Sequence, residues 1–555
     1  MRRLFPALLA LLPLALHAYQ PAFSQAGYFP AEDSPRTVSS LNPGWDFARG
    51  DGYKARVNLP HTLNVVGFET SGGTNYQGPA TYEKRFDWAQ KGQRQFLHFE
   101  AIMGKSKIFL NGEQVGQRFG GYHPIHLEVT GKLKPTGNLL RVECDNSDDK
   151  DYPPGKVQEQ LDFSYFGGIY RDVWLIETGP VALSAPGPQG GVYLATKRLA
   201  EGKWQVTARV ALDGQGSVRR LYEGKEVPET FTVDNPPEWT PDTPALHFLR
   251  VEAIAPDGTL SDAADVRFGF RDVQITSDQG LILNGKPWRK LIGANRHQDF
   301  AFVGNAMSNL LHYRDAVKLR EAGLTLIRNA HYLQDPAFMD ACDEVGLFVI
   351  ANTPGWQFWN KKPIFGQRVL DDIRAMVRRD RSRPCLLLWE PILNETYYPG
   401  DTAKSWVAAV KQEADLGPDL CACDSGAKGQ QHYDIIFRHP AGSTNEAHSV
   451  GPEGNRPTFT REWGDCVDDW SSHNSPSRAD RAWGEIPQLI QARHYLDTTD
   501  PDFPVTSLTM LLAQPPKHFG GALWHSFDHA RGYHPDMFYG GIMTSARLPK
   551  TSYWM

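Results

Sequence analysis

The second half of the chain alternates between short apolar strands and amphipathic helices, and this alternation constrains the fold more than any other feature of the 555 residues. Eight strand candidates follow one another there, beginning near Leu291, Leu324, Leu347, Leu386, Leu420, Asp434, Thr458 and Gly521. Strands that alternate with helices form parallel sheets, and eight such units over a stretch of this size are typical of a (β/α)8 barrel, the TIM barrel. We therefore predict a barrel over residues 276–555. A doubly wound open sheet is the alternative, but no glycine-rich phosphate loop follows any of the strands.

One helix of this region carries clear signals at both ends. Asp335 precedes Pro336, and proline is favoured at the first position of a helix, while Gly346 follows the last turn. Between these signals, apolar side chains recur at helical spacing, at Phe338, Met339, Cys342 and Val345. The sequence predicts a helix between residues 335 and 346.

The first half of the chain consists of short strand patterns broken by Gly, Pro and Asn, which is typical of all-β domains. We predict a jelly-roll β-sandwich over residues 27–180, in which Asn111-Gly112 between two apolar runs indicates a hairpin. Residues 181–275 continue with alternating strands and fit an immunoglobulin-like β-sandwich. We predict that the proline-rich stretch Pro236–Pro244 is a loop within this second sandwich.

The N-terminus has the composition of a targeting segment. Two arginines precede the apolar run Leu4–Leu16, which is too short to cross a bilayer as a mature helix. We predict a signal peptide over residues 1–26, with cleavage after Ala18 or Ala26, and a protein exported to the periplasm, the cell surface or the medium. An anchoring N-terminal helix is the alternative. No later stretch of the sequence is long and apolar enough to span a membrane.

Charge and cysteine content bear on partners and cofactors. The formal net charge is −6, which gives no electrostatic basis for binding nucleic acid or an anionic membrane. Export permits disulfides, but four of the six cysteines stand in apolar helix or strand patterns typical of buried thiols: Cys342, Cys385, Cys421 and Cys423. Cys421 and Cys423 alternate on one strand, which is not a zinc spacing. We predict no disulfide framework, no structural metal and no cofactor.

Two glutamates stand where buried strands of the predicted barrel end. Glu395 follows the fourth strand and Glu462 ends the seventh, so both belong to the active-site face of such a barrel. Hydrolysis of a glycosidic bond needs one carboxylic acid to protonate the leaving oxygen and one carboxylate facing the anomeric carbon. At a separation of about 5 Å the second group is a nucleophile and configuration is retained. The pair predicts a retaining glycosidase; the alternative is that each glutamate is a cap or a salt-bridge partner.

Three further polar residues end strands on the same face. Arg328 ends the second strand, where it is placed to keep a nearby carboxylate ionised. His297 follows the first strand and His331 the second, positions from which we expect them to bind sugar hydroxyls. The alternative for both histidines is a packing or surface role.

The chain resembles glycoside hydrolase family 2, the family of β-galactosidases, β-glucuronidases and β-mannosidases, through nearly all of its mature length. The motifs similar to the family's sugar-binding domain are Leu59-Pro60-His61-Thr62, Leu110-Asn111-Gly112, Gly120-Gly121-Tyr122 and Gly167-Gly168-Ile169-Tyr170-Arg171-Asp172-Val173. The motifs similar to its barrel signatures are Asn295-Arg296-His297, Ile327-Arg328-Asn329-Ala330-His331-Tyr332, Arg381-Ser382-Arg383-Pro384, Asn394-Glu395, Gly521-Ala522-Leu523-Trp524 and Tyr539-Gly540-Gly541-Ile542.

The resemblance implies a role for each residue of the site. It implies that Glu395 is the general acid/base, that Glu462 is the nucleophile, that Asn394 binds the 2-hydroxyl of the sugar and that Arg328 supports the nucleophile. The remaining residues that it places in the sugar subsite are His297, His331, Trp524 as a stacking platform, Asp528, and Asp162 from the first sandwich.

Departures from the family's pattern bear on the substrate. Glu390 stands where the family usually has a small residue, and Arg438-His439 stands where a tyrosine that contacts the nucleophile often occurs, so we include all three among the candidate substrate-binding residues. Residues 351–356 lack the acid and histidine that hold magnesium in well-known β-galactosidases, and we expect no catalytic metal. The Asn-x-Lys pair of glucuronidases is missing before Gly541, which argues against a glucuronide, although Arg438 is a candidate partner for a carboxylate.

We therefore expect an exported, retaining exo-β-glycosidase that removes terminal β-linked sugars, first of all galactose, from oligo- or polysaccharides. The alternatives within the class are a β-glucuronidase, a β-galacturonidase and an enzyme for modified polysaccharides. The alternative outside it is a noncatalytic carbohydrate-binding protein on the same scaffold. Family members usually continue with further sandwich domains, so we expect a chain that ends at Met555 to be a short form or a fragment.

Overall fold

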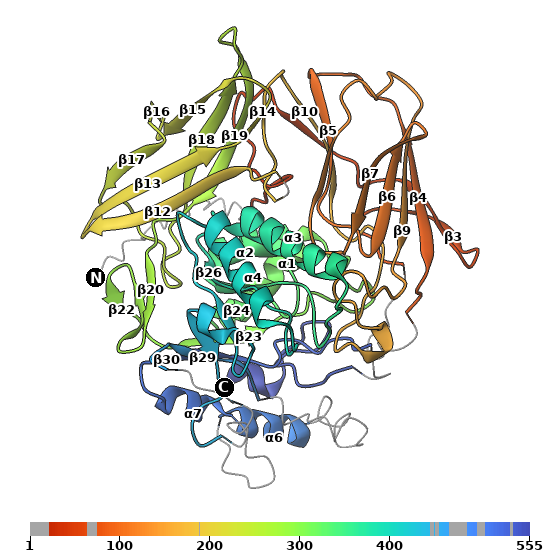
Figure 1. Ribbon diagram of the computed structural model, residues 1–555. Coiled ribbons are helices and arrows are strands. Elements are labelled where there is room, and N and C mark those ends of the chain that lie inside the picture. The colour runs from red at the N-terminus through yellow and green to blue at the C-terminus, as the bar shows by residue number, and fades with distance from the viewer. Residues whose placement is uncertain are drawn as a thin grey trace, which may run out of the picture.

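The protein consists of two β-sandwiches and a parallel barrel, which confirms the predicted fold class. The computed structural model describes residues 21–63, 75–187, 189–443, 449, 454–464, 485–496, 506–532 and 537–555. Figure 1 shows the two sandwiches side by side, with the helices of the barrel packed below them. The segment predicted to be a signal peptide lies largely outside the described residues.

The first sandwich packs a six-stranded sheet, in the order β3-β2-β4-β9-β6-β7, against a four-stranded sheet in the order β1-β10-β5-β8. The predicted hairpin is confirmed: Leu110 pairs with Glu113, and Asn111 and Gly112 both have positive φ. The strands are β1 (Thr37–Ser40), β2 (Trp45–Arg49), β3 (Lys54–Val57), β4 (Pro79–Phe86), β5 (Arg94–Phe99), β6 (Lys105–Leu110), β7 (Glu113–Phe119), β8 (Ile125–Glu128), β9 (Asn138–Asp145) and β10 (Val173–Thr178), with a 3-10 turn at Gln158–Gln160.

The second sandwich is built from β12-β13-β17 and β16-β15-β18-β19, with the short pair β11-β14 beside them. The stretch Pro236–Pro244 is the connection between β17 and β18, and its Trp239 is fully buried against Phe348 of the barrel. The strands are β11 (Ala182–Leu183), β12 (Val192–Ala200), β13 (Lys203–Val210), β14 (Leu212–Asp213), β15 (Ser217–Tyr222), β16 (Lys225–Glu226), β17 (Thr230–Asp234), β18 (His247–Ile254) and β19 (Leu260–Phe268).

The barrel is an eight-stranded parallel sheet in the order β26-β25-β24-β23-β30-β29-β28-β27, and a bridge between Trp389 and Cys421 closes it. Its strands are apolar runs because helices and side chains cover both faces of a parallel sheet. They are β23 (Leu291–Asn295), β24 (Leu326–Arg328), β25 (Phe348–Asn352), β26 (Leu386–Glu390), β27 (Ala422–Asp424), β28 (Ile435–Phe437), β29 (Thr458–Trp463) and β30 (His518–Leu523), preceded by the small sheet β20 (Val273–Thr276), β21 (Gly280–Leu283) and β22 (Lys286–Pro287).

The helices of the barrel follow the strands. They are α1 (Asn309–Glu321), α2 (Pro336–Val345), α3 (Pro363–Asp380), α4 (Gly400–Glu413), α6 (Glu485–Leu496) and α7 (Leu508–Ala513), with 3-10 turns η2 (Gln430–His432) and η5 (Thr551–Trp554). Helix α2 has the predicted ends: the Asp335 carboxylate accepts a hydrogen bond from the Ala337 amide, and Gly346 takes the left-handed conformation that glycine favours. No described helix has both the length and the apolar character that a membrane span requires.

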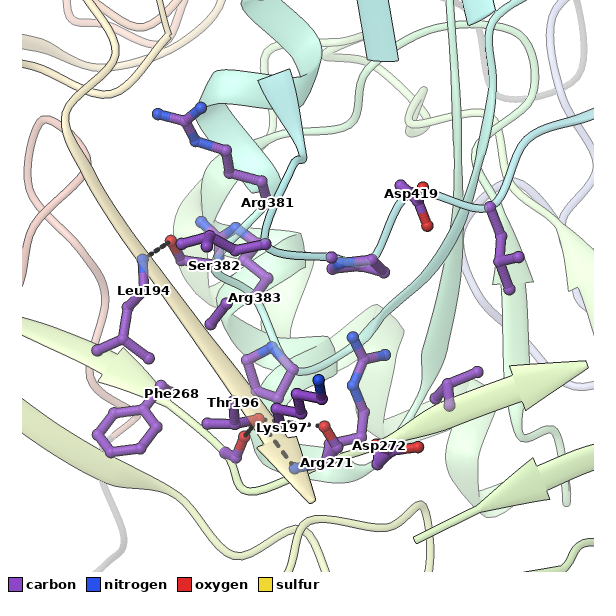
Figure 2. A pocket seen from close by; sticks show the side chains of 18 of the residues that line it. Leu194, Thr196, Lys197, Phe268, Arg271, Asp272, Arg381, Ser382, Arg383 and Asp419 are labelled. Carbon is purple, nitrogen blue, oxygen red and sulfur yellow. Dashed lines mark hydrogen bonds between the residues drawn. The ribbon is translucent and has the colours of Figure 1, made fainter. Parts of the chain in front are cut away.

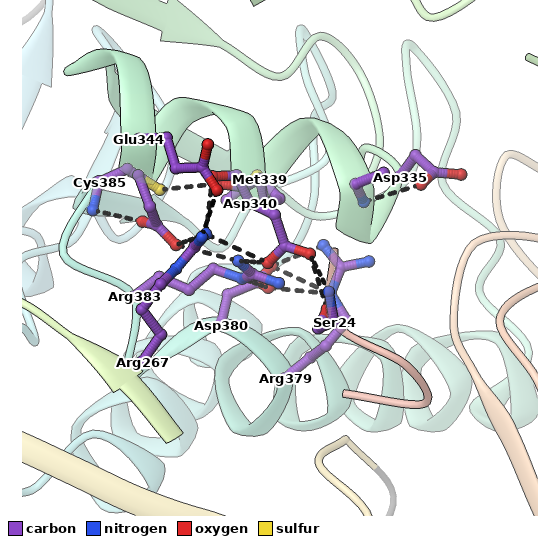
Figure 3. A network of polar contacts seen from close by, with 12 residues as sticks. Ser24, Arg267, Asp335, Met339, Asp340, Glu344, Arg379, Asp380, Arg383 and Cys385 are labelled. Carbon is purple, nitrogen blue, oxygen red and sulfur yellow. Dashed lines mark hydrogen bonds and ion pairs between the residues drawn. The ribbon is translucent and has the colours of Figure 1, made fainter. Parts of the chain in front are cut away.

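A buried ion network joins the second sandwich and the N-terminal segment to the barrel (Figure 3). Arg267 of β19 pairs with Glu344 of α2 at 2.7 Å, and Arg383 pairs with Asp340 of the same helix at 2.7 Å. Asp340 also accepts hydrogen bonds from the backbone amide and the hydroxyl of Ser24. Because these charges are buried and paired, the network fixes the sandwich against one side of the barrel.

A pocket lies between the second sandwich and the barrel, at the end where the barrel strands begin. Figure 2 shows that Leu194 and Thr196 of the sandwich line it together with Ser382 and Arg383 of the barrel, and that the Leu194 amide donates to the Ser382 hydroxyl. Arg271 donates a hydrogen bond to the carbonyl of Leu386, the first residue of β26. The pocket is therefore at the opposite end of the strands from the residues that follow them, among which the candidate site lies.

Candidate active site

Arg328 is the centre of the polar cluster at the ends of the barrel strands. It is fully buried, and its five N–H groups all donate: two to Glu390, one to Asn394, one to Asn295 and one to Glu462, at 2.6–2.9 Å. A guanidinium presents these donors in one plane with a fixed geometry. Arg328 therefore sets the positions of residues from β23, β26 and β29 relative to one another.

Glu390 is the counter-charge of Arg328. Its two carboxylate oxygens accept from the Nε and Nη2 atoms of the guanidinium, and only 1% of the residue is exposed. Burial raises the pKa of Glu390, and the contact with Arg328 offsets part of that effect. Glu390 is thus a third carboxylate of this cluster, besides Glu395 and Glu462, and its charge is paired with Arg328.

Glu390→Gln is expected to destabilise the protein, because the variant leaves the buried charge of Arg328 short of its main partner. We expect a loss of about 3 kcal/mol, as is typical when one partner of a buried pair is removed. Thermal unfolding measures it, with Glu229→Gln in the exposed part of the second sandwich as the matched control. Equal midpoints for Glu390→Gln and the control would show that the pair contributes little.

A β-bulge brings two consecutive residues of β29 into the same site. Alternate side chains of a strand normally point to opposite faces, so Arg461 and Glu462 would be expected to diverge. The register between β29 and β30 shifts between Thr460 and Trp463, where one extra residue of β29 is accommodated. Arg461 donates from Nη1 to Glu462 itself, at 2.5 Å, which shows that both side chains face one another.

Arg461 connects both strand-end glutamates. Its Nη2 donates to the Oε1 atom of Glu395 at 3.1 Å, and its Nη1 donates to Asn394 at 2.7 Å as well as to Glu462. Its Nε lies 2.6 Å from Asp424, at the end of β27. Both strand-end glutamates therefore accept hydrogen bonds from one guanidinium.

Glu395 is held in a backbone conformation that a residue with a side chain rarely adopts. Its φ is +51°, and its amide donates to the Asp424 carboxylate at 3.0 Å. Its Oε2 accepts from Gln357 at 2.8 Å. Burial favours the neutral acid, but Arg461, Gln357 and Arg328 together favour the anion more and lower the pKa of Glu395. The carboxylate is thus ionised in this arrangement.

Asn394 has one end of its amide fixed and the other available. Its Oδ1 accepts from Arg328 at 2.9 Å and from Arg461 at 2.7 Å, which defines the orientation of the amide. Among the described residues, its buried Nδ2 has no hydrogen-bond partner. An unpaired buried donor is costly in a folded protein, so this group is suited to a ligand acceptor such as a sugar hydroxyl.

The rings of the two predicted histidines both contact Trp524. The rings of His331 and Trp524 stack at 5.3 Å between centroids, and the Nδ1 atom of His297 lies 3.2 Å from the Tyr332 hydroxyl. Burial holds the pKa of both histidines well below its usual range, so both rings are neutral. His297 Nε2 and His331 Nδ1 are buried and hydrogen bond to no other atom in the described part of the chain. Phe163 of the first sandwich packs over His297 at 5.4 Å.

Four other predicted residues have protein partners. Asp162, from the first sandwich, lies 2.8 Å from Arg531. Asp528 accepts from Lys550 at 2.7 Å, and both residues are nearly fully buried. Arg438 and His439 follow β28, where Arg438 donates to the Ser449 carbonyl and the His439 backbone amide donates to the Ser449 hydroxyl oxygen at 2.8 Å. Their roles in substrate binding stay predictions.

Arg461, Asp424 and Gln357 were not predicted from the sequence. Arg461 precedes the nucleophile candidate directly, so strand alternation assigns it to the other face. Asp424 follows the fifth strand, and its position at a strand end was the signal that could have identified it. Gln357 lies in the loop after β25, for which the sequence offers no comparable signal.

The described residues contain no cluster of three or more histidine, cysteine or acidic side chains arranged to hold a metal ion. Cys144, Cys342, Cys385, Cys421 and Cys423 are buried free thiols, and Cys466 lies outside the described residues. The polar side chains described at the strand ends are carboxylates, guanidinium groups, imidazoles and an amide.

Models of one family match all three parts of the chain. The sugar binding domain of glycosyl hydrolases family 2 matches residues 38–179, a second model of the family matches 194–271, and its TIM barrel domain matches 273–418. Together these segments cover more than half of the sequence. The chain belongs to glycoside hydrolase family 2, as the resemblance predicted, and so to the glycoside hydrolases.

The similar proteins are named as β-galactosidases or β-glucuronidases. A β-galactosidase of Thermoanaerobacter pseudethanolicus is 32% identical over 382 residues, which are 64% of this chain and 50% of that protein. A β-glucuronidase of Bacteroides fragilis is 28% identical over 432 residues, 69% of this chain and 60% of that protein. A solved β-glucuronidase structure from Ruminococcus gnavus has a TM-score of 0.78 at 18% identity and covers 96% of this chain and 98% of its own. The chain spans about half the length of the curated relatives it matches.

Proposed function

We propose that the protein is a retaining exo-β-glycosidase whose preferred substrates are β-galactosides. The observation that carries this proposal is the convergence of Glu395 and Glu462 on the guanidinium of Arg461, at 3.1 and 2.5 Å. Retaining glycosidases need two close carboxylates, whereas inverting enzymes hold them further apart to admit a water molecule. Beside this pair, the unpaired polar atoms of Asn394, His297 and His331 supply groups for sugar hydroxyls.

The reaction proceeds in two displacements. Glu462 attacks the anomeric carbon, the bond to the leaving oxygen breaks, and Glu395 gives that oxygen its proton. The sugar is then joined to Glu462 as an ester, and the negative charge of Glu462 is lost. Glu395, now an anion, takes a proton from water, which attacks the anomeric carbon and releases the sugar with its β configuration.

The charges of the site favour a neutral sugar over a uronic acid. Four carboxylates, those of Glu390, Glu395, Glu462 and Asp424, face two guanidinium groups. The nearby Asp162–Arg531 and Asp528–Lys550 pairs are each neutral as pairs. When Glu395 holds its proton, the carboxylates of Glu390, Glu462 and Asp424 balance the cations of Arg328, Arg461 and Lys156. The cluster then has no excess positive charge to pair with an anionic sugar.

Hydrolysis of a panel of aryl β-glycosides tests the proposal. We expect release of the aglycone from the β-galactoside with the highest kcat/KM, and slower or undetectable release from the β-glucuronide, β-galacturonide, β-mannoside and β-glucoside. A higher kcat/KM for a uronide would reverse the charge argument and favour the β-glucuronidase alternative. Binding of galactosides without hydrolysis of any member would favour a noncatalytic carbohydrate-binding protein.

We also propose that the protein is exported. Contacts of the N-terminal segment favour one of the two candidate cleavage sites, Ala18 and Ala26. Ser24 hydrogen bonds to Asp340 and Ala26 is buried, so cleavage after Ala26 would remove a segment that contacts the barrel. We expect cleavage after Ala18, which gives a mature protein that begins at Tyr19. N-terminal sequencing of protein recovered outside the cytoplasm measures it. A first residue of Gly27 would contradict this expectation, and an intact Met1 would contradict cleavage itself.

A further inference from the structure

Arg461 contacts the two glutamates that must exist in opposite protonation states during the first displacement. Glu462 has to be an anion to attack, whereas Glu395 has to hold a proton to release the leaving group. The guanidinium donates to both carboxylates, and a charged donor favours the anion on each of them. The contact with Glu395 therefore suits the second displacement, in which Glu395 is a base, and opposes the first.

Asp424 ties Arg461 to the backbone of Glu395. One carboxylate oxygen of Asp424 lies 2.6 Å from Arg461 Nε, and the other accepts from the Glu395 amide at 3.0 Å. The side chains of Arg461 and Asp424 are 17% and 20% exposed, so the guanidinium stands at the open side of the cluster, unlike the fully buried Arg328. Arg461 thus has an anchor that remains when its contact with Glu395 is broken.

We propose, on the basis of the proposed function, that Arg461 is a positioning residue that swings on Asp424: it must release Glu395 for proton donation, and it returns to Glu395 when Glu462 has become an ester. Loss of the Glu462 charge removes one of the guanidinium's anionic partners in the intermediate. Glu395 and Asp424 are then its nearest counter-charges, which draws it back to Glu395 as that residue becomes the base.

Several groups around Glu395 influence whether its carboxyl group is protonated. Two of them are guanidinium groups, and Arg461 is the more exposed of the two. Arg461 contacts Glu395 directly, and its anchor Asp424 can be changed separately. The charged and polar groups that face Glu395 are Arg461 and Glu462 of β29, Arg328 of β24, Asp424 of β27, Gln357 after β25, and Lys156 of the first sandwich.

Two substitutions that each remove one charge are expected to move the pH profile in opposite directions. The readout is the alkaline limb of kcat/KM for a substrate with a poor leaving group, because that limb reports loss of the proton from the acid of the free enzyme. Arg461→Met removes the cation, and we expect the limb to move up by about one pH unit or more. Asp424→Asn keeps an acceptor for the Glu395 amide but frees the guanidinium for Glu395, and we expect the limb to move down.

A conservative variant separates charge from shape. Arg461→Lys keeps the positive charge on a single donor head, and we expect its limb to lie between those of the wild type and Arg461→Met. A purely structural role would lower kcat/KM in all three variants and leave the limb at the same pH. Limbs that do not move, or that move in the same direction in Arg461→Met and Asp424→Asn, would overturn the proposal.

A second measurement needs no turnover and so distinguishes this inference from the proposed function. Carbodiimide coupling of an amine to protonated carboxyl groups, followed by peptide mass spectrometry, gives the protonation of Glu395 as a function of pH in the free protein. We expect the midpoint for Glu395 to rise in Arg461→Met and to fall in Asp424→Asn. Unchanged midpoints would overturn the inference even in an active enzyme. If these shifts occur in a protein that hydrolyses no glycoside, they support the effect of Arg461 on Glu395 and contradict only the proposed function.

Discussion

Glu462→Gln is expected to lower kcat more than about 10⁴-fold on every glycoside that the wild type hydrolyses, because removal of a nucleophile abolishes the covalent route. The amide has the size of the carboxylate and can still accept from Arg328 and Arg461, which contact Glu462 at 2.8 and 2.5 Å. It cannot form a stable glycosyl ester. Steady-state kinetics with an activated aryl glycoside measures the loss.

The control for this variant is Glu113→Gln, an exposed glutamate of the first sandwich. It makes the same chemical change far from the strand ends, and we expect wild-type kinetics. Circular dichroism and thermal unfolding show whether Glu462→Gln is folded. Hydrolysis by a folded Glu462→Gln at a rate within tenfold of the wild type would show that another group is the nucleophile.

Glu395→Ala is expected to separate substrates by their leaving groups. For aglycones that need protonation, kcat/KM should fall by about 10²- to 10⁴-fold, the usual contribution of a general acid. For activated aryl glycosides, whose phenolate leaves without a proton, the first displacement should be affected far less. Measurement of kcat/KM over a series of aryl glycosides with increasing leaving-group pKa gives the comparison.

The slope of that series decides the assignment of Glu395. A general acid makes the wild-type rate nearly independent of leaving-group pKa, and its loss makes the rate fall steeply as the pKa rises. Parallel lines for wild type and Glu395→Ala would mean that Glu395 contributes to binding or folding but not to protonation. Glu390→Gln serves as the comparison with the adjacent carboxylate, and we expect it to keep the wild-type slope because Glu390 faces Arg328.

The barrel could be predicted because its strands are buried on both faces. Leu291, Leu386 and Thr458 begin strands where the apolar runs indicated, and the other five predicted starts lie within three residues of the observed ones. Burial on both faces gives continuous apolar runs, which are strong signals in a single sequence. Polar residues directly after such runs then identify the active-site end, and this is how Glu395, Glu462 and Arg328 were found.

The partners of the site residues were harder to predict, because they are set by contacts between strands. A β-bulge turns the Arg461 side chain into the site, and the polar–apolar pattern of β29 gives no indication of the extra residue. The role of Glu390 depends on where Arg328 points, which is decided by packing across the barrel. Asp162 of the first sandwich pairs with Arg531 in the loop after β30, although more than half of the sequence separates the two residues. No periodicity in the sequence encodes such a contact.

The most direct test of the double displacement is the identity of the residue that carries the sugar in the covalent intermediate. Glu395→Ala lacks the base for the second step, so the intermediate should accumulate when this variant is mixed with the activated aryl glycoside that the wild type cleaves fastest. Acid quenching and peptide mass spectrometry then locate the added sugar mass. The expected result is a single glycosylated residue, Glu462. A sugar on a different carboxylate, or no adduct together with release of the inverted anomer, would contradict the mechanism.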